Sequence, residues 1–223
     1  MTEIASIYLC DDEDDVRGGL SFLLRHCGFA VQAFASGSAL LEGIALAPTP
    51  LRAIFLLDLD MPPMDGDAVH DQLIARGYTQ CSPVIFLSGR GTIARAVSAV
   101  NKGALDFVEK PLTNDTLLPL LQRATTLEAQ RFAERQRCDF LRFMWAKLSQ
   151  QQRKVALLVA AGDLNKTIAS KLEIVERTVE MHRAKTFEKL GVDSPAALAT
   201  TIAAMKACGI ECGADVPAAV GDK

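Results

Sequence analysis

The chain has 223 residues, of which 49% are hydrophobic and 23% charged, and its formal net charge is −3. This balance is ordinary for a globular protein, and the length predicts two small domains, each with its own core. No apolar run approaches the roughly 18 residues of a membrane span, and the acidic start does not resemble a signal peptide. We therefore expect a cytoplasmic protein without membrane contacts.

Charge is divided unevenly along the chain. Residues 1–122 hold 8 Lys+Arg and 15 Asp+Glu, a net charge of −7. Residues 123–223 hold 16 and 12, a net charge of +4. The difference suggests different partners for the two halves: a metal ion for the acidic N-terminal half and nucleic acid for the basic C-terminal half.

The six cysteines form no CxxC pair and have no nearby histidine at a metal-ligand spacing, so we expect neither a zinc site nor a disulfide framework. They are Cys10, Cys27, Cys81, Cys138, Cys208 and Cys212. Most are expected to be small core residues. Cys208 and Cys212 lie near the C-terminus and are expected to be exposed thiols, with no role assigned.

The first half alternates short apolar runs with helical patterns. Strands are predicted at residues 7–10, 30–34, 53–57, 83–88 and 106–109, with helices at 16–27, 37–47, 67–77 and 92–103. Five strands separated by helices predict an α/β fold with a doubly wound five-stranded parallel sheet. Right-handed crossovers would place the C-terminal ends of all five strands at one edge.

Strand patterns stop at about Thr113. Four residues could cap the next helix: Thr113, Asn114, Asp115 and Thr116. If Thr116 is the cap, Pro119 falls at the third helical position, where a missing N–H costs nothing. Residues 120–145 are rich in charge and also carry large apolar side chains, which predicts a helical linker.

Residues 146–208 predict a second, all-α domain of four short helices. Ser149 and Gln152 match a capping box at the start of the first. Ser194-Pro195 matches a cap followed by proline at the first helical position, and opens the last.

Charged and polar side chains follow four of the predicted strands. Asp11 and Asp12 follow the first strand, Asp58 the third, Ser88 the fourth and Lys110 the fifth. Ligands of open α/β sheets bind beyond the carboxyl ends of the strands, and carboxylate oxygens suit Mg²⁺. A bound Mg²⁺ would draw in a phosphoryl donor, and Lys110 and Ser88 would hold a phosphoryl group on an aspartate.

This half resembles the receiver domain of two-component response regulators, which has a flavodoxin-like fold. Four motifs in order carry the resemblance: "CDDE" (10–13), "LLDLDMPPMDG" (56–66), "FLSGRG" (86–91) and "GALDFVEKP" (103–111). Taken singly, each acid could be a solvated loop residue. Taken jointly with a lysine at the last strand, they favour the functional interpretation.

The resemblance implies a role for each acid at the edge. Asp58 would accept a phosphoryl group from a sensor histidine kinase. Asp12 and Asp58 would bind Mg²⁺, with the backbone carbonyl of Asp60 as a third ligand and Asp11 acting through water. The other nearby acids are interpreted as cap and turn residues: Asp14, Asp15, Asp65 and Asp67.

The resemblance also implies a switch. Ser88 and Phe107 hold the positions of the hydroxyl and the aromatic ring that move on phosphorylation, and Ser88 and Lys110 stabilise the phosphoryl group. Lys110-Pro111 matches a peptide bond that is usually cis. The Asp60 side chain would repel the phosphoryl group unless Arg90 offsets its charge, so we expect this pair to tune the lifetime of the aspartyl phosphate.

The middle helices of the second domain have helix-turn-helix spacing. One is expected from a capping Asn165 to Leu172, the other from about Glu176 to Leu190. The segment resembles the LuxR-type output domain of FixJ- and NarL-like regulators through "LSQQQRKVALLVAAG" (148–162), "NKTIASKL" (165–172) and "RTVEMHRAKTFEKLGV" (177–192). Val175 departs from the serine usual before the recognition helix.

The resemblance implies that the second helix of this pair enters the major groove of promoter DNA. Exposed charge there would otherwise be only a solvated helix face. The residues expected to contact bases or phosphates are Lys166, Thr167, Arg177, Thr178, Glu180, Met181, Arg183 and Lys185.

Together these features predict a DNA-binding response regulator that is not an enzyme, apart from Mg²⁺-dependent self-phosphorylation and dephosphorylation at Asp58. A phosphorylated homodimer would present two recognition helices about 34 Å apart. Two alternatives remain: an output that binds protein instead of DNA, and a DxD-type phosphatase. Met61 argues against the phosphatase, because such enzymes usually have a small β-branched residue after the DxD motif. The expected division is a receiver (1–122), a linker (123–145), an output domain (146–208) and a frayed tail (209–223).

Overall fold

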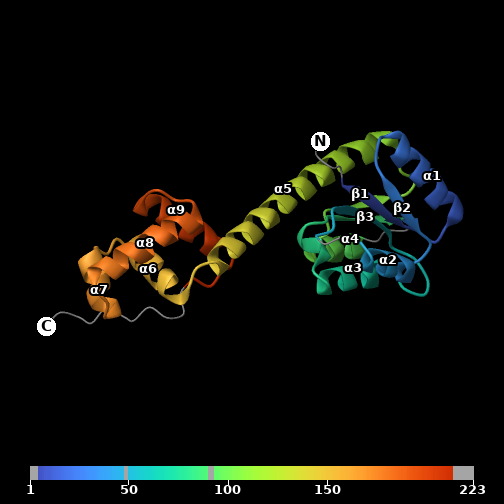
Figure 1. Cartoon of the computed structure of the whole chain (residues 1–223). Helices are drawn as coiled ribbons and strands as arrows, with labels where there is room; N and C mark the ends of the chain where they lie inside the picture. The colour runs from blue at the N-terminus through green and yellow to red at the C-terminus, as the bar shows by residue number, and fades with distance from the viewer. Residues whose placement is uncertain (1–4, 48–49, 90–92, 213–223) are drawn as a thin grey trace. The chain divides into compact units, whose positions relative to one another are not determined.

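The computed structural model of the chain describes residues 5–47, 50–89 and 93–212 (Figure 1). The chain divides into two compact units, Met1–Arg135 and Gln136–Lys223. Within the described residues, no helix combines the length and the apolar character that crossing a membrane requires.

The first unit is built on a five-stranded parallel sheet of strand order β2-β1-β3-β4-β5, which confirms the predicted fold class. The strands are β1 (Ser6–Cys10), β2 (Val31–Phe34), β3 (Ala53–Asp58), β4 (Val84–Ser88) and β5 (Asp106–Glu109). The helices are α1 (Asp14–His26), α2 (Gly37–Ala45), α3 (Gly66–Ala75), α4 (Ile93–Asn101) and the first part of α5 (Asn114–Ala146), with a short 3₁₀ turn η1 (Tyr78–Gln80) that was not predicted.

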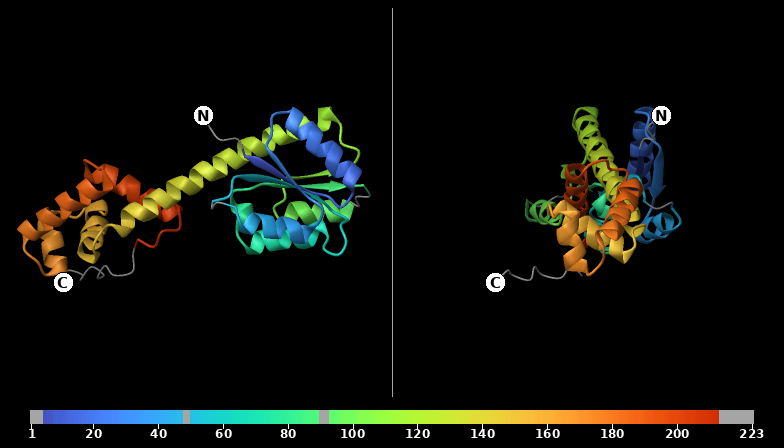
Figure 2. Two further views of the ribbon diagram at one scale, coloured as in Figure 1. Left: turned by 45° about the vertical axis from the view of Figure 1, so that its right-hand side comes forward. Right: turned by 60° about the vertical axis from the view of Figure 1, so that its left-hand side comes forward.

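Two apolar layers enclose the sheet, one on each face. Helices α1 and α5 cover one face and α2, α3 and α4 the other, as both views of the unit show (Figures 1 and 2). Strand β3 is buried along its whole length. Its side chains alternate, with Ile54 and Leu56 in the layer under α1 and α5, and Phe55 and Leu57 in the opposite layer. A central parallel strand covered on both faces requires this continuous apolar run.

Gly66 explains how the loop after β3 packs against the strand. A Cβ at Gly66 would lie 2.3 Å from the backbone oxygen of Asp58, so only glycine fits there. The Asp65 side chain accepts a hydrogen bond from the N–H of Ala68 and caps α3, which confirms its prediction as a cap. The turn therefore fixes the position of the strand end that carries Asp58.

Helix α5 begins at Asn114, directly after Thr113, the first of the four candidate caps. Thr116 and Pro119 therefore lie inside the helix, and Thr116 is not its cap. Leu117 and Leu120 are buried against the sheet, and this apolar packing outweighs the hydrogen bond that proline removes.

An ion pair between Arg52 and the buried Glu128 connects α5 to the sheet. Arg52 precedes β3, and its Nε and Nη2 donate to the two carboxylate oxygens of Glu128 at 2.9 and 2.8 Å. The Glu128 side chain is fully buried. The guanidinium carbon of Arg52 also lies 4.6 Å from the ring centre of Phe132. Helix α5 therefore belongs to the first unit well beyond residue 122.

The second unit contains α6 (Gln150–Ala160), α7 (Asn165–Leu172), α8 (Glu176–Leu190) and α9 (Pro195–Ala207), together with the end of α5. The predicted capping box of Ser149 and Gln152 is present, and Ser194 caps α9 with Pro195 at its start. Asn165 is not the cap of α7. Leu164 holds that position without a side-chain bond, and Asn165 is the first helical residue.

The core of the second unit extends past both predicted ends of the output domain. Trp145 is buried in this core, with Leu141 and Met144 packed against it, so the last turns of the predicted linker belong to the unit. Ile210 and Cys212 are also buried there. The expected frayed tail is therefore wrong for residues 209–212, because these apolar side chains cover the core. Residues 213–223 lie outside the described residues.

The expectation that the cysteines form no disulfides is wrong for one pair. Cys138 of α5 and Cys208, the C-cap of α9, form a disulfide. Cys212 is buried and is not an exposed thiol. Sequence spacing could not show this pair, because the packing of α9 against α5 sets the distance between the two residues.

Candidate functional site

The acidic edge of the sheet is where the first unit gathers its charges. Asp11 and Asp12 follow β1, and Asp58 ends β3, as predicted. Their carboxylate oxygens lie within 4.8 Å of one another. Asp11 is fully buried and the Asp58 side chain is 5% exposed, while Asp12 is half-buried. The structure thus brings together the three acids that the sequence singled out.

Lys110 joins two of these acids. Its Nζ lies 2.7 Å from Oδ2 of Asp11 and 2.9 Å from Oδ1 of Asp58. The backbone N–H of Lys110 donates to the carbonyl of Ser88 at 2.8 Å, which places the lysine at the end of β4. The Lys110–Pro111 peptide is cis, as predicted, and Pro62–Pro63 is a second cis peptide that was not expected.

Burial and neighbouring charges shift the pKa values of Asp58 and Lys110 in opposite directions. Burial raises the pKa of Asp58 above its usual value, and the Lys110 ammonium opposes this rise. Burial alone would lower the pKa of Lys110, but its bonds to Asp11 and Asp58 raise it. Lys110 is therefore a fixed positive charge beside Asp58. Within the part of the chain that the structure describes, the cluster of Asp11, Asp12 and Asp58 with the Lys110 ammonium carries more negative than positive charge.

The Asp60 side chain lies apart from this cluster. Its carboxylate is half-exposed, and Arg95 Nη1 of α4 donates to its Oδ1 at 2.6 Å. Arg95 Nη2 also lies 3.4 Å from Asp67 Oδ2. The expected partner, Arg90, lies outside the described residues. Sequence reasoning missed Arg95; the only signal was a basic residue in the first turn of the helix after β4.

The predicted switch residues lie on neighbouring strands. Ser88 is fully buried at the end of β4. Phe107 is half-buried in β5, packs against the apolar layer of α2, α3 and α4, and pairs in register with Phe86. The described residues thus place a hydroxyl and an aromatic ring on strands that adjoin the acidic edge.

The helix-turn-helix of the second unit consists of α7 and α8. Ile168 and Ala169 of α7 and Val179 of α8 are buried in the shared core. The tight turn between the helices places Glu173 in the left-handed region at φ 54°, and the N–H of Ile174 donates to the carbonyl of Ala169 at 3.0 Å. Val175 caps α8 without a side-chain bond, yet the helix still begins at Glu176 as expected.

Most of the predicted DNA-contacting side chains are exposed on this pair of helices. The exposed ones are Lys166, Thr167, Arg177, Glu180, Met181 and Lys185. Thr178 and Arg183 are half-buried. Arg183 Nη1 donates to Oδ1 of Asn165 at 3.1 Å and its guanidinium lies 5.4 Å from the ring centre of Phe187, so this arginine ties α8 to α7.

Comparisons with known proteins match both units. The model of the "Response regulator receiver domain" family matches residues 7–122. The model of "Bacterial regulatory proteins, luxR family" matches residues 146–202. The matched ranges contain the acidic edge and the helix-turn-helix.

Relatives and solved structures match across both units. The chain is 36% identical over 195 residues to the tetrathionate response regulatory protein TtrR of Salmonella typhimurium, covering 87% of this chain and 90% of TtrR. It is 35% identical over 190 residues to the transcriptional regulatory protein FixJ of Rhizobium meliloti, covering 85% of this chain and 90% of FixJ. The structure of the response regulator StyR is similar with a TM-score of 0.81 and 32% identity, over 90% of this chain and 99% of StyR.

These matches agree with the residues that the two units display. The receiver match covers a buried cluster of carboxylates with a lysine, and the luxR-family match covers two helices with an exposed, charged face. The relatives are named as response regulators and as transcriptional regulators. The chain belongs to the family of two-component response regulators that join a receiver domain to a LuxR-type DNA-binding domain.

Proposed function

We propose that Asp58 is the phosphoryl acceptor of this regulator. The observation that carries the proposal is the position of its carboxylate, at the end of a buried strand and 2.9 Å from the Lys110 ammonium. Asp11 is held by the same ammonium and by the N–H of Glu13, which donates to its Oδ1 at 3.0 Å. Asp60 and Asp65 are occupied by an ion pair and a helix cap. Asp58 is thus the acid best placed to attack a phosphorus atom.

The donor chemistry follows from the charges at the edge. An oxygen of Asp58 attacks the phosphorus of a phosphohistidine on a sensor kinase, and the histidine nitrogen leaves. Lys110, with the hydroxyl of Ser88, stabilises the charge on the transferred phosphoryl oxygens. Asp58 must be ionised to attack, and the ammonium beside it favours that form.

The acidic cluster fits Mg²⁺. Three carboxylates lie within 4.8 Å of one another, and Lys110 is the one cation for which an ion pair with them is seen among the described residues, so a divalent cation would balance the charge. Asp12 and Asp58 would hold it directly with the carbonyl of Asp60, and Asp11 would act through water. Bound there, Mg²⁺ would neutralise phosphoryl oxygens during transfer.

The Asp60 side chain supports a tuning role that now involves Arg95. We expect Arg95 to hold the Asp60 carboxylate, because the described ion pair is 2.6 Å long. A phosphoryl group on Asp58 would compete for this arginine. Together with Ser88 and Phe107, this competition would couple the acidic edge to α4.

The exposed face of α7 and α8 is proposed to bind promoter DNA. Arg177 and Lys185 suit phosphates, and Glu180 and Met181 suit base edges in the major groove. Lys166 and Thr167 lie at the start of α7, where the N–H groups of a helix end favour a phosphate. Phosphorylated chains would dimerise and present two such faces to a DNA site whose halves are related by two-fold symmetry. We place this activity in the cytoplasm, where the DNA is.

Acetyl phosphate with Mg²⁺ tests the acceptor. We expect wild type to gain the mass of one phosphoryl group, located by peptide mapping to Asp58, and Asp58→Asn to gain none. Asp60→Asn is the matched control, because it removes an acid two residues away and should still be phosphorylated. Phosphorylation of Asp58→Asn at the wild-type level would refute the assignment.

A salt-dependent gel shift tests the output. Phosphorylated wild type should bind a two-fold related promoter fragment more tightly than Asp58→Asn does. The affinity should fall as salt rises, because the lysines and arginines displace counterions from the phosphates. A phosphorylated protein that captures no DNA would favour a protein-binding output.

A further inference from the structure

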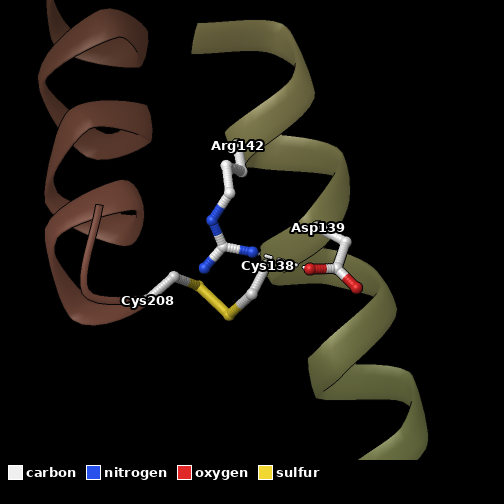
Figure 3. The surroundings of a disulfide bond; sticks show 4 residues. All are labelled: Cys138, Asp139, Arg142 and Cys208. Carbon is white, nitrogen blue, oxygen red and sulfur yellow. Dashed lines mark hydrogen bonds and ion pairs between the residues drawn. A yellow bond between two sulfur atoms is a disulfide. The ribbon is translucent and has the colours of Figure 1, made fainter. Parts of the chain in front are cut away.

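A disulfide joins two helices of the second unit. Cys138 in α5 is bonded to Cys208 at the end of α9, and the two residues are 70 apart in the sequence (Figure 3). Their Cα atoms are 5.4 Å apart, within the range in which two cysteines can bond without backbone movement. Neither residue has a part in phosphoryl transfer or in DNA contacts as proposed above.

The bonded cysteines are more accessible than the three buried thiols, which are Cys10, Cys81 and Cys212. Cys138 and Cys208 are half-buried, which leaves them within reach of small molecules in solution. Burial, together with the charge of Asp11, raises the pKa of Cys10 to about 12, and burial raises the pKa of Cys212. Those thiols stay protonated and unreactive. Cys27 is also half-buried, but it is free.

An arginine lies beside the pair. Arg142 is one turn after Cys138 on α5, and Figure 3 shows its side chain directed along the side of the helix that carries the disulfide. Its Nη1 donates to Oδ1 of Asp139 at 2.6 Å. A guanidinium near a cysteine favours the thiolate, which is the form that attacks disulfides, whereas the Glu134 carboxylate, with an oxygen within 4.8 Å of both sulfurs, disfavours it.

We propose that Cys138 and Cys208 are a redox site of the output unit, a dithiol that low-molecular-weight disulfides oxidise and low-molecular-weight thiols reduce. The proposal rests on the cytoplasmic function proposed above, because thiols in a cytoplasm are kept reduced and a disulfide there is usually reversible. The site would give the regulator a second chemical input, independent of Asp58.

The exchange balances in two steps. One protein thiolate attacks the small disulfide, forms a mixed disulfide and releases one small thiol. The second protein thiolate attacks the protein sulfur of that mixed disulfide, closes the Cys138–Cys208 bond and releases the other small thiol. The protein loses two electrons and two protons, and the two small thiols carry them away.

The bond would act on the attachment of α5 to the helix-turn-helix unit. Residues 136–146 of α5 contribute Trp145 to the core, with Leu141 and Met144 packed against it. With the bond open, this packing and the hydrogen bonds that Arg153 donates to the carbonyls of Trp145 and Ala146 would still hold the segment, but its local opening would become more frequent. The segment lies between the receiver and the helix-turn-helix along the chain, so any signal carried by α5 passes through it.

Thiol titration of the full-length protein tests the site. The protein is equilibrated in glutathione buffers of increasing disulfide fraction, folded thiols are labelled with a maleimide, and labels and linked peptides are identified by mass. We expect wild type to lose two labels together, to regain them on reduction, and to yield a linked Cys138–Cys208 peptide. Cys27→Ser should behave in the same way, whereas Cys138→Ser and Cys208→Ser should lose no pair.

Two results would overturn the proposal. One is a label count in folded wild type that is the same at every ratio, because the bond would then be permanent or absent. The other is a linked peptide joining different cysteines. The readout needs neither Asp58 nor DNA, so a protein that exchanges thiols but takes no phosphoryl group would refute the proposed function and leave the redox site standing.

Hydrogen exchange tests the consequence. The amides of residues 136–146 should exchange several-fold more slowly in the oxidised protein, and the second unit should melt roughly 5–15 °C higher. Cys208→Ser should show no effect of redox state, and Cys27→Ser should keep the wild-type effect. Equal exchange of this segment in oxidised and reduced wild type would show that the bond has no influence on α5.

Discussion

The two functional surfaces of the chain differ in where their charges lie. At the acidic edge, the side chains of Asp11, Asp58 and Lys110 are 0%, 5% and 12% exposed. On α8, Arg177 and Lys185 are exposed to solvent. The proposed phosphorylation site of the receiver is therefore buried, whereas the proposed DNA-contacting side chains of the output unit lie on its surface.

This difference predicts how substitutions behave. Removing one member of a buried ion pair leaves its partner charged in a poorly solvated place, so fold and function are lost together. Removing an exposed charge leaves the core intact, so function changes alone. Substitutions at the acidic edge should therefore destabilise the fold, whereas substitutions on the exposed face of α8 should leave the fold intact.

Lys110→Ala should give the largest effect. It leaves two buried carboxylates without their shared ammonium, and we expect the first unit to lose roughly 3–5 kcal/mol in urea unfolding. The control is Lys102→Ala, whose exposed pair with Asp71 should contribute less than about 1 kcal/mol.

The loss in Lys110→Ala should depend on pH. Without the ammonium, the pKa of Asp58 in the folded state rises further above its unfolded value, so the folded state binds a proton more tightly. The stability difference from wild type should therefore shrink as the pH falls below neutral. Mg²⁺ should shrink it at neutral pH. A pH-independent difference would show that repulsion between the carboxylates is not its cause.

Gly66→Ala should have the next largest effect. Its Cβ would meet the Asp58 carbonyl, 2.3 Å away, and backbone cannot rotate aside, so we expect a loss of roughly 2–3 kcal/mol and slower phosphorylation. Gly18→Ala is the control in α1, where nothing lies within 4 Å; it should be neutral or stabilise by up to about 1 kcal/mol. Equal stabilities of the two variants would contradict the close approach at Asp58.

Arg177→Ala should change DNA binding without changing the fold. We expect roughly a fivefold loss of affinity, a salt slope reduced by about one, and an unfolding midpoint like that of wild type. Lys206→Ala, a basic residue near the end of α9, is the matched control and should bind normally. Unfolding of the second unit in Arg177→Ala would contradict the contrast between the two surfaces.

Glu173→Gly should give the smallest effect and the opposite sign. Glu173 is held at φ 54°, where glycine carries no penalty, so stability should rise by up to about 1 kcal/mol. Glu180→Gly, the same change within α8, should instead cost about 1 kcal/mol. Thermal unfolding of the two variants checks the sign, and destabilisation by both would contradict the strain assigned to the turn.

Sequence reasoning succeeded where local rules decide the result. Asp11, Asp58 and Lys110 follow apolar strands, and the parallel topology brings strand ends together without any further information. It failed where long-range packing decides. Arg95 reaches from α4 to Asp60 in the loop after β3, and Cys138 meets Cys208 across 70 residues. Local rules also left four candidate caps for α5 open, because the packing of Leu117 and Leu120 against the sheet is a long-range contact.

Helix α5 contributes to the cores of both units, and this determines where the chain can be cut into fragments. Its early turns bury Leu117, Ala124 and Glu128 in the first unit, and its last turns bury Trp145 in the second, while residues 133–137 are exposed. A cut after residue 122 would leave Arg52 without Glu128 and expose the sheet that Ala124 covers. A cut between residues 133 and 137 severs neither core, so soluble halves of this regulator should be sought there.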